Sequence, residues 1–226
     1  MADDGRVHLW NVEDRTESST LQTGKVNLIA FSPDSKLLAA STLDGNVELW
    51  DTTTTTRIST FTGHKDRISS LAFSPDGLLL ATGGYDFTVY LWDVVSGLPI
   101  HSLESDDHYV DGIANLTFSP DGSFLAFHGA DSVSVWDVAL WEPIGDLDEH
   151  RHPTSLVFSP DGSLIILGTL GGTINLWDFM ADKSHILETE NLYSPWINDV
   201  AISSDGLLIA SAEENGYTRL WGVPSD

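Results

Sequence analysis

The chain has 226 residues, of which 41% are hydrophobic and 19% charged, so the composition favours a folded domain with a core over disorder. Ten Lys and Arg stand against 34 Asp and Glu, which leaves a net charge of −24 and argues against nucleic acids and anionic membranes as partners, since both bind through cations. The sequence contains no cysteine, which excludes disulfides, thiolate metal sites and thiol catalysis.

The amino terminus, MADDGRVHLWNV, has neither the basic start nor the long apolar segment of a secretion signal. No stretch approaches the roughly 20 apolar residues of a membrane helix. We therefore expect a cytoplasmic protein. The acidity is interpreted as a means of solubility, and the alternative is a surface that attracts a basic partner.

Tryptophan recurs every 40 to 44 residues, at Trp10, Trp50, Trp92, Trp136, Trp177 and Trp221. A period of this length indicates a repeat architecture in which each unit is one supersecondary motif. We divide the chain, as a single domain over residues 1–226, into a partial repeat 1–10 and the repeats 11–50, 51–92, 93–136, 137–177 and 178–221.

In chain order, the partial repeat contributes a strand at 5–10, and each later repeat contains three apolar runs. The first run precedes a turn and the second follows it, the turns being SPDS at 32–35, SPDG at 74–77, 119–122 and 159–162, and SSDG at 203–206. The third run ends on the periodic tryptophan. Short apolar runs bounded by turn residues predict strands buried on both faces, because a helix needs ten or more residues. A looser fourth segment, such as 57–61, completes each unit.

In each SPDG, Pro fixes φ, Asp bonds its own backbone and Gly takes a positive φ, so the motif predicts a hairpin turn. A four-stranded unit cannot bury both faces alone and must stack on its neighbours. Radial stacking gives an all-β propeller of four-stranded blades with about five to six repeat units. The expected strands are two at the start, four sets of four, and three at the end.

These motifs resemble the WD-repeat (WD40-type) β-propeller family. The units end in Trp-Asp at 50–51, 92–93, 136–137 and 177–178, and Gly63-His64 matches the family's opening dipeptide. The resemblance implies a buried hydrogen-bonded network of a His, a strand hydroxyl, a turn Asp and the Trp. In this chain the implied members are His64, Thr82, Asp86 and Trp92.

Other repeats depart from the family pattern. TGK replaces the His dipeptide in the second repeat, Phe127 stands at the hydroxyl position of the fourth, and Leu167 stands there in the fifth. We therefore expect one complete network. The repeat count also predicts a propeller that is incomplete or atypically closed, and open strand edges favour self-association.

Catalysis is not predicted, because the chain has no GxSxG, phosphate-binding glycine loop or HExxH motif. The densest His and carboxylate clusters lie at 106–111 and 148–152, in expected surface loops. We interpret them as solvated loops and expect no metal and no cofactor; a metal-binding protein that uses these histidines is an alternative.

The most favoured function is a non-catalytic scaffold for protein–protein contact, and a structural fragment of a larger multidomain protein is a second alternative. Loops between second and third strands, and those leading into first strands, are expected to gather on one end. Aromatic and Arg side chains there are typical interface anchors. The candidate partner-binding residues are Lys65, Arg67, Tyr85, His108, Tyr109, Asp111, His150, Arg151, His152, Tyr193, Trp196 and Glu214.

Overall fold

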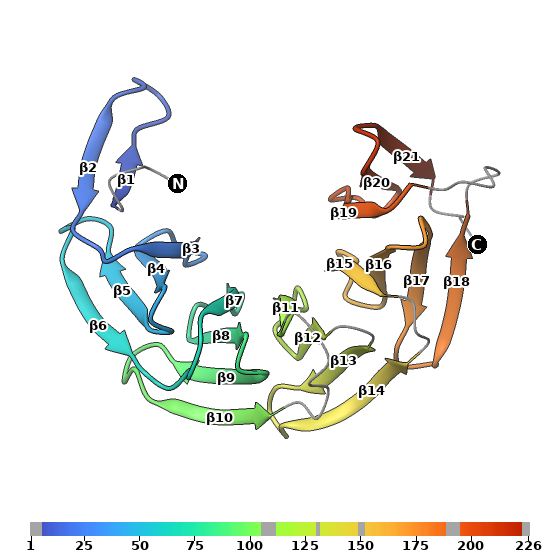
Figure 1. The fold of residues 1–226 in the computed structure, drawn as a ribbon, viewed down its shortest axis with the longest axis horizontal. Helices are drawn as coiled ribbons and strands as arrows, with labels where there is room; N and C mark the ends of the chain where they lie inside the picture. Colours follow the sequence, from blue (N-terminus) through green and yellow to red (C-terminus); the bar gives the residue numbers. More distant parts are fainter. Residues whose placement is uncertain (1–5, 105–111, 130–131, 149–151, 189–194, 223–226) are drawn as a thin grey trace. The chain divides into compact units, whose positions relative to one another are not determined.

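The computed structural model describes residues 6–104, 112–129, 132–148, 152–188 and 195–222, which form 21 β-strands and no helix (Figure 1). Neighbouring strands are antiparallel and make six sheets, which confirms the predicted all-β, four-stranded units. The sheets are β1 (Val7–Trp10) and β2 (Glu17–Leu21); β3 (Val26–Phe31), β4 (Leu37–Thr42), β5 (Val47–Asp51) and β6 (Arg57–Phe61); β7 (Ile68–Phe73), β8 (Leu79–Gly84), β9 (Thr88–Asp93) and β10 (Pro99–Glu104); β11 (Ala114–Phe118), β12 (Phe124–His128), β13 (Ser132–Asp137) and β14 (Glu142–Asp148); β15 (Pro153–Phe158), β16 (Ile165–Thr169), β17 (Ile174–Asp178) and β18 (Lys183–Leu187); and β19 (Ile197–Ile202), β20 (Leu208–Glu213) and β21 (Thr218–Gly222).

Each four-stranded sheet is offset from the tryptophan repeats. The third strand carries the tryptophan, and the fourth strand of the sheet belongs to the next repeat, as β6 does in the sheet β3–β6. The predicted distribution of two, sixteen and three strands is confirmed for the described residues.

The turn between first and second strands is held by its own side chains. In the sheet β7–β10, Ser74 Oγ donates to Asp76 Oδ1 at 2.6 Å, and the same carboxylate oxygen accepts from the Leu78 amide at 3.0 Å. These hydrogen bonds lower the pKa of Asp76. Gly77 has a φ of +73°, which a residue with a side chain rarely adopts. The same Ser–Asp bond recurs in the other SPD and SSD turns, which explains their regular spacing.

The chain divides into two compact units, residues 1–108 and 109–226, and each is described here by itself. In unit 1, Leu49 and Phe61 of β3–β6 pack against Ile68, Leu80 and Trp92 of β7–β10. In unit 2, one core joins β11–β14 to β15–β18, and a second joins β15–β18 to β19–β21. Each of these three cores therefore lies between two sheets, as expected for units that stack. Whether residues 1–226 act as one domain stays a prediction.

The prediction that the strands are buried on both faces holds for the second strands β4, β8, β12 and β16 and for the third strands β5 and β17, but it is wrong for β3, β20 and β21. Ile29 and Phe31 of β3 are 51% and 52% exposed, and Leu208 and Leu220 of β20 and β21 are 47% and 69% exposed. A first strand lies at the edge of its sheet, and β19–β21 is covered by a sheet of unit 2 on one face alone among the described residues. The apolar pattern of a strand does not show whether another sheet covers each of its faces.

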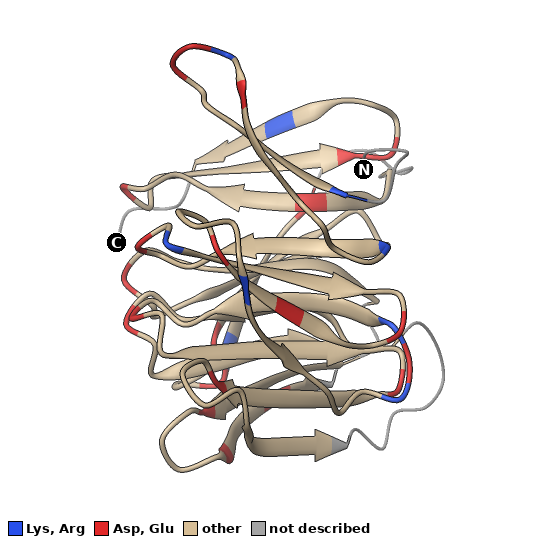
Figure 2. Cartoon of the chain, turned by 90° about the vertical axis from the view of Figure 1, so that its left-hand side faces the viewer, with Lys and Arg blue, Asp and Glu red and all other residues tan. Residues whose placement is uncertain are grey.

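Charged residues lie mainly in turns and at strand ends, and the strand bodies are largely uncharged (Figure 2). No described segment is a helix of the length and hydropathy required to span a membrane.

Candidate functional site: the loop face

A backbone hydrogen bond joins two loops at one end of four sheets. In each sheet, a backbone amide in the turn after the second strand donates to the backbone carbonyl of the residue that precedes the first strand. In unit 1 the bonds run from Leu43 N to Lys25 O at 3.0 Å and from Tyr85 N to Arg67 O at 2.9 Å; in unit 2 they run from Leu170 N to His152 O at 3.1 Å and from Glu214 N to Trp196 O at 2.9 Å. We call these residues, with Lys65, the loop face of the respective unit. The two loop classes are thus adjacent within each of these sheets, as the sequence predicted.

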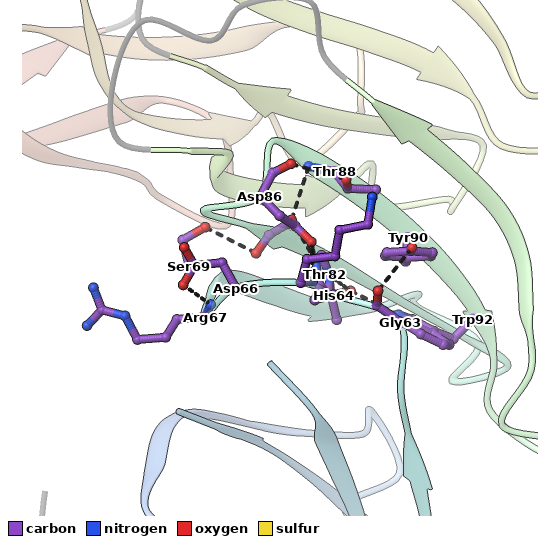
Figure 3. Close-up of polar contacts among 12 residues, drawn as sticks. Gly63, His64, Asp66, Arg67, Ser69, Thr82, Asp86, Thr88, Tyr90 and Trp92 are labelled. Carbon is purple, nitrogen blue, oxygen red and sulfur yellow. Dashed lines mark hydrogen bonds and ion pairs between the residues drawn. The ribbon is translucent and has the colours of Figure 1, made fainter. Parts of the chain in front are cut away.

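The loop face of unit 1 rests on a buried network in the sheet β7–β10 (Figure 3). Trp92 Nε1 donates to Thr82 Oγ1 at 2.9 Å, Thr82 Oγ1 lies 2.8 Å from His64 Nε2, and His64 Nδ1 lies 2.9 Å from Asp86 Oδ1. The neutral tautomer with hydrogen on Nδ1 satisfies every group, because Thr82 then donates to Nε2 and Nδ1–H donates to Asp86. The four residues that the family resemblance implied therefore form one hydrogen-bonded chain.

Asp86 connects this network to the surface. Its Oδ2 accepts from the backbone amide of Lys65 at 2.7 Å, and its Oδ1 accepts from the amide of Thr88 at 3.2 Å. Burial acts to raise the pKa of Asp86, but the hydrogen bonds from His64 and the two amides outweigh burial and hold the pKa below its ordinary value. The carboxylate therefore ties the loop before β7 to the turn after β8.

Arg67 and Tyr85 form the outer layer of the same site. The guanidinium carbon of Arg67 lies 5.1 Å from the centre of the Tyr85 ring, within the range of a cation–π contact. Tyr85 is 37% exposed, and Figure 3 shows Arg67 extending away from the sheet. An aromatic ring and a guanidinium on a rigid base are suited to anchoring a protein partner, since less side-chain entropy is lost on binding.

The loop face of unit 1 continues onto the neighbouring sheet. Gly45, in the turn after β4, has a φ of +77°, and a Cβ there would lie 2.5 Å from the carbonyl oxygen of Asp66. The turn of one sheet therefore touches the loop of the next. Lys25 and Leu43, which is 41% exposed, belong to this surface and were not among the sequence candidates. Their repeat positions, equivalent to Arg67 and Tyr85, could have identified them.

On the loop face of unit 2, Trp196 is 50% exposed and Leu170 is 38% exposed. This exposure leaves the indole of Trp196 accessible to a partner. His152, Trp196 and Glu214 are the candidates that the structure places on this loop face. The remaining candidates lie outside the described residues: His108, Tyr109, Asp111, His150, Arg151 and Tyr193.

Two other sheets satisfy their tryptophans differently. In β3–β6, Trp50 Nε1 donates to Glu48 Oε2 at 3.2 Å, and Glu48 Oε1 accepts from Arg57 at 2.7 Å. In β19–β21, Trp221 Nε1 donates to Ser211 at 3.0 Å. Glu48 was missed by sequence analysis because its role depends on the pairing of β5 with β6, which brings Arg57 beside it. Among the described residues, the four-member network occurs in β7–β10 alone.

No group of three or more His, Asp or Glu side chains within the described ranges is arranged to hold a metal ion. The two sequence clusters near residues 106–111 and 148–152 fall largely outside those ranges, so the metal alternative for them stays a hypothesis.

His128 is a buried neutral base in unit 2. Its Nδ1 donates to the carbonyl of Gly129 at 2.8 Å, and its Nε2 accepts from Asn115 Nδ2 at 3.2 Å. Burial lowers the pKa of His128, and the hydrogen bond to Gly129 opposes this only in part. Both ring nitrogens are satisfied without added protons, which indicates a structural role and not a catalytic base.

This burial predicts a loss of stability in mild acid. Because the folded pKa lies below the unfolded value of about 6.5, the unfolded chain binds more protons between the two values. The contribution of His128 to the free energy of unfolding of unit 2 should therefore be fully present above about pH 6.5. The free energy of unfolding should fall as the pH decreases below that value. Urea unfolding at pH 7.5 and 5.5 measures this fall, which should shrink in His128→Gln and persist in the exposed control His185→Gln. Equal falls in both variants would contradict the assignment.

Known proteins share the repeat. A family model described as WD domain, G-beta repeat matches residues 16–51, 55–93, 141–178 and 186–222, more than half of the chain. The human WD repeat and SOCS box-containing protein 1 is 30% identical over 93 residues, which cover 40% of this chain and 22% of that protein. Periodic tryptophan protein 2 of Arabidopsis thaliana is 29% identical over 182 residues, which cover 78% of this chain and 20% of that protein. The chain thus spans about a fifth of the length of these relatives.

Among solved structures, a chain of the crystal structure of the mitotic checkpoint complex aligns with a TM-score of 0.83 at 22% identity. The alignment covers 98% of this chain and 69% of that chain. At this identity the similarity establishes the fold, an all-β propeller of four-stranded blades, and nothing about partners.

Proposed function

The chain belongs to the WD-repeat family, whose members generally mediate protein interactions, and from this premise we propose that it is a non-catalytic scaffold that binds protein or peptide partners on its loop face. The observation that carries the proposal is the rigid pairing of Arg67 with Tyr85 above the His64–Asp86 network. Interface hot spots are enriched in Arg, Tyr and Trp on such supported positions.

The charge of the chain indicates which charge the proposed partner should carry. The net charge of −24 favours a partner that is basic overall, because long-range attraction speeds its approach. Lys25, Lys65 and Arg67 on the loop face of unit 1 favour contact there with acidic or aromatic side chains of that partner.

The experiment measures the affinity of one purified partner, first identified by cross-linking to the intact chain, for four variants. Tyr85→Ala tests the loop face of unit 1 and Trp196→Ala that of unit 2. The variant of the loop face that holds the partner should weaken binding at least tenfold, since truncating a central aromatic anchor costs about 2 kcal/mol or more. The matched controls are Leu78→Ala and Leu207→Ala, exposed residues in the first-to-second-strand turns of the same two sheets. Both controls should bind within twofold of the unaltered chain. If the Tyr85 and Trp196 variants bind as the controls do, the loop face is not the partner site.

A further inference from the structure

Side-chain hydrogen bonds connect three first strands of unit 2 in a line that ends beside the loop face. Asn115 of β11 donates from Nδ2 to the carbonyl of Thr154 on β15 at 2.8 Å, and Thr154 donates from Oγ1 to the carbonyl of Ile197 on β19. Thr154 lies two residues after His152, and Ile197 directly follows Trp196. The line therefore holds the two strands that begin next to these loop-face residues.

The buried ring of His128 lies beside Asn115 at the other end of the line. Its Nε2 accepts from Asn115 Nδ2 at 3.2 Å, and its Nδ1 donates to the carbonyl of Gly129 at 2.8 Å. Asn115 Nδ2 carries two hydrogens, so it serves His128 and Thr154 together only while Nε2 keeps a free lone pair. The line is therefore complete when His128 is neutral.

Protonation of His128 is incompatible with this arrangement. The protonated Nε2 carries a hydrogen, so two donors would face each other at 3.2 Å. Rotation of the Asn115 amide would satisfy the ring, but it would place Oδ1 against the carbonyl oxygen of Thr154. His128 is 5% exposed and bonded to Gly129, whereas Asn115 is exposed, so Asn115 is the residue that moves. Its hydrogen bond to Thr154 is lost in either case.

Few other ionisable groups surround His128 among the described residues. The strands β11 and β15 contain none, and Asp137 of β13 lies at the far end of its sheet, opposite Phe124. Asp199 of β19 is hydrogen-bonded to β15, and His152 precedes β15. Of these groups, His152 alone has an ordinary pKa in the same range as that of a histidine sensor, so the experiment must separate it from His128.

We propose that His128 is a pH sensor for the loop face of unit 2. At neutral pH the line from His128 to Ile197 is complete, and the loop face holds its partner. In mild acid Asn115 leaves Thr154, the strands that begin at the loop face are held less firmly, and the partner is bound less tightly. The statement about a partner rests on the function proposed above.

NMR spectra of the full chain without a partner test the sensor itself. The ring proton at Cε1 of His128 is followed from pH 7.5 to 5.0, together with the side-chain amide of Asn115 and the indole of Trp196. We expect all three signals to change with one midpoint below about pH 6.5, because burial lowers the pKa of His128. His128→Gln does not titrate and should abolish the changes at Asn115 and Trp196. Changes that persist in this variant would overturn the proposal.

Three further variants assign the response. His152→Gln should leave the midpoint unchanged, as should the control His185→Gln, which alters an exposed histidine of β18. Asn115→Asp should raise the His128 midpoint by about one pH unit, because a carboxylate there accepts from the protonated ring. Aspartate also tolerates the positive φ of 44° at this position. Loss of the response in His152→Gln, or an unchanged midpoint in Asn115→Asp, would overturn the proposal.

The affinity of the partner identified by cross-linking is then measured at pH 7.5 and 5.5. It should weaken in acid by about fivefold, the ratio that corresponds to one hydrogen bond, and His128→Gln should remove most of this difference. Equal weakening in both proteins would overturn the regulatory role. If Trp196→Ala leaves the affinity unchanged, the partner does not bind this loop face and the regulatory role fails with it, whereas the NMR response still decides whether His128 and Asn115 form a switch.

Discussion

Alanine in place of His64 should lower the free energy of unfolding of unit 1 by about 3 kcal/mol. The His64 side chain is fully buried and that of Asp86 is 7% exposed, so the substitution leaves a nearly buried carboxylate without its imidazole donor. Thr82 loses its acceptor at the same time, and water has little access to either group. The cost is that of unsatisfied buried groups and not the modest net value of one exposed hydrogen bond.

Urea unfolding measures this loss, and His185→Ala, an exposed histidine of unit 2, serves as the control that should change stability by less than about 0.5 kcal/mol. Amide hydrogen exchange gives a second readout, since β8 and β9 should be among the last strands of unit 1 to exchange in the unaltered chain and should exchange faster in His64→Ala. A double-mutant cycle with Asp86→Ala should be strongly non-additive. A loss below 1 kcal/mol would contradict the role assigned to the network.

Valine in place of Asn175 should raise the free energy of unfolding of unit 2 by about 1 to 2 kcal/mol. Asn175 is fully buried on β17, and neither its side-chain nitrogen nor its oxygen has a hydrogen-bond partner in the described part of the chain. Burying an unsatisfied amide is unfavourable, and a β-branched apolar residue suits a central strand. The Nε1 of Trp177, on the same strand, likewise has no hydrogen-bond partner in the described part of the chain, so this buried ring contributes through packing.

Asn27→Val is the matched comparison for this prediction. Asn27 Nδ2 donates to the carbonyl of Ile68 at 2.7 Å, which links β3 to β7, so its replacement should destabilise unit 1 by about 1 kcal/mol. Opposite signs for the two Asn→Val substitutions, measured as shifts in urea midpoint, would confirm the distinction between satisfied and unsatisfied amides. A loss of more than 1 kcal/mol in Asn175→Val would show that the Asn175 amide has a hydrogen-bond partner after all.

The loop face shows how far the repeat pattern alone can locate a site. Tyr85 lies in a loop between second and third strands, and Arg67 and Trp196 lie in loops that lead into first strands. The repeat pattern predicts that these two classes of loop converge, and backbone bonds join them within each of the two sheets. Sequence could not show that Arg67 lies over the Tyr85 ring, because that contact depends on side-chain directions in two loops separated along the chain. Whether these residues bind a partner stays a prediction for the affinity measurements.

The sequence by itself determined the strand order, the turns and the family, because these depend on local signals: Ser-Pro-Asp-Gly sets the backbone of a turn, and short apolar runs set the strands beside it. It also identified the His64 network, since its members stand at family positions. Only the tertiary structure decided which apolar residues are covered. Ile29 and Leu156 occupy the same repeat position and have the same apolar character, yet one is half exposed and the other buried. Burial depends on the sheet that packs against a residue, and that neighbour is not encoded within the repeat itself.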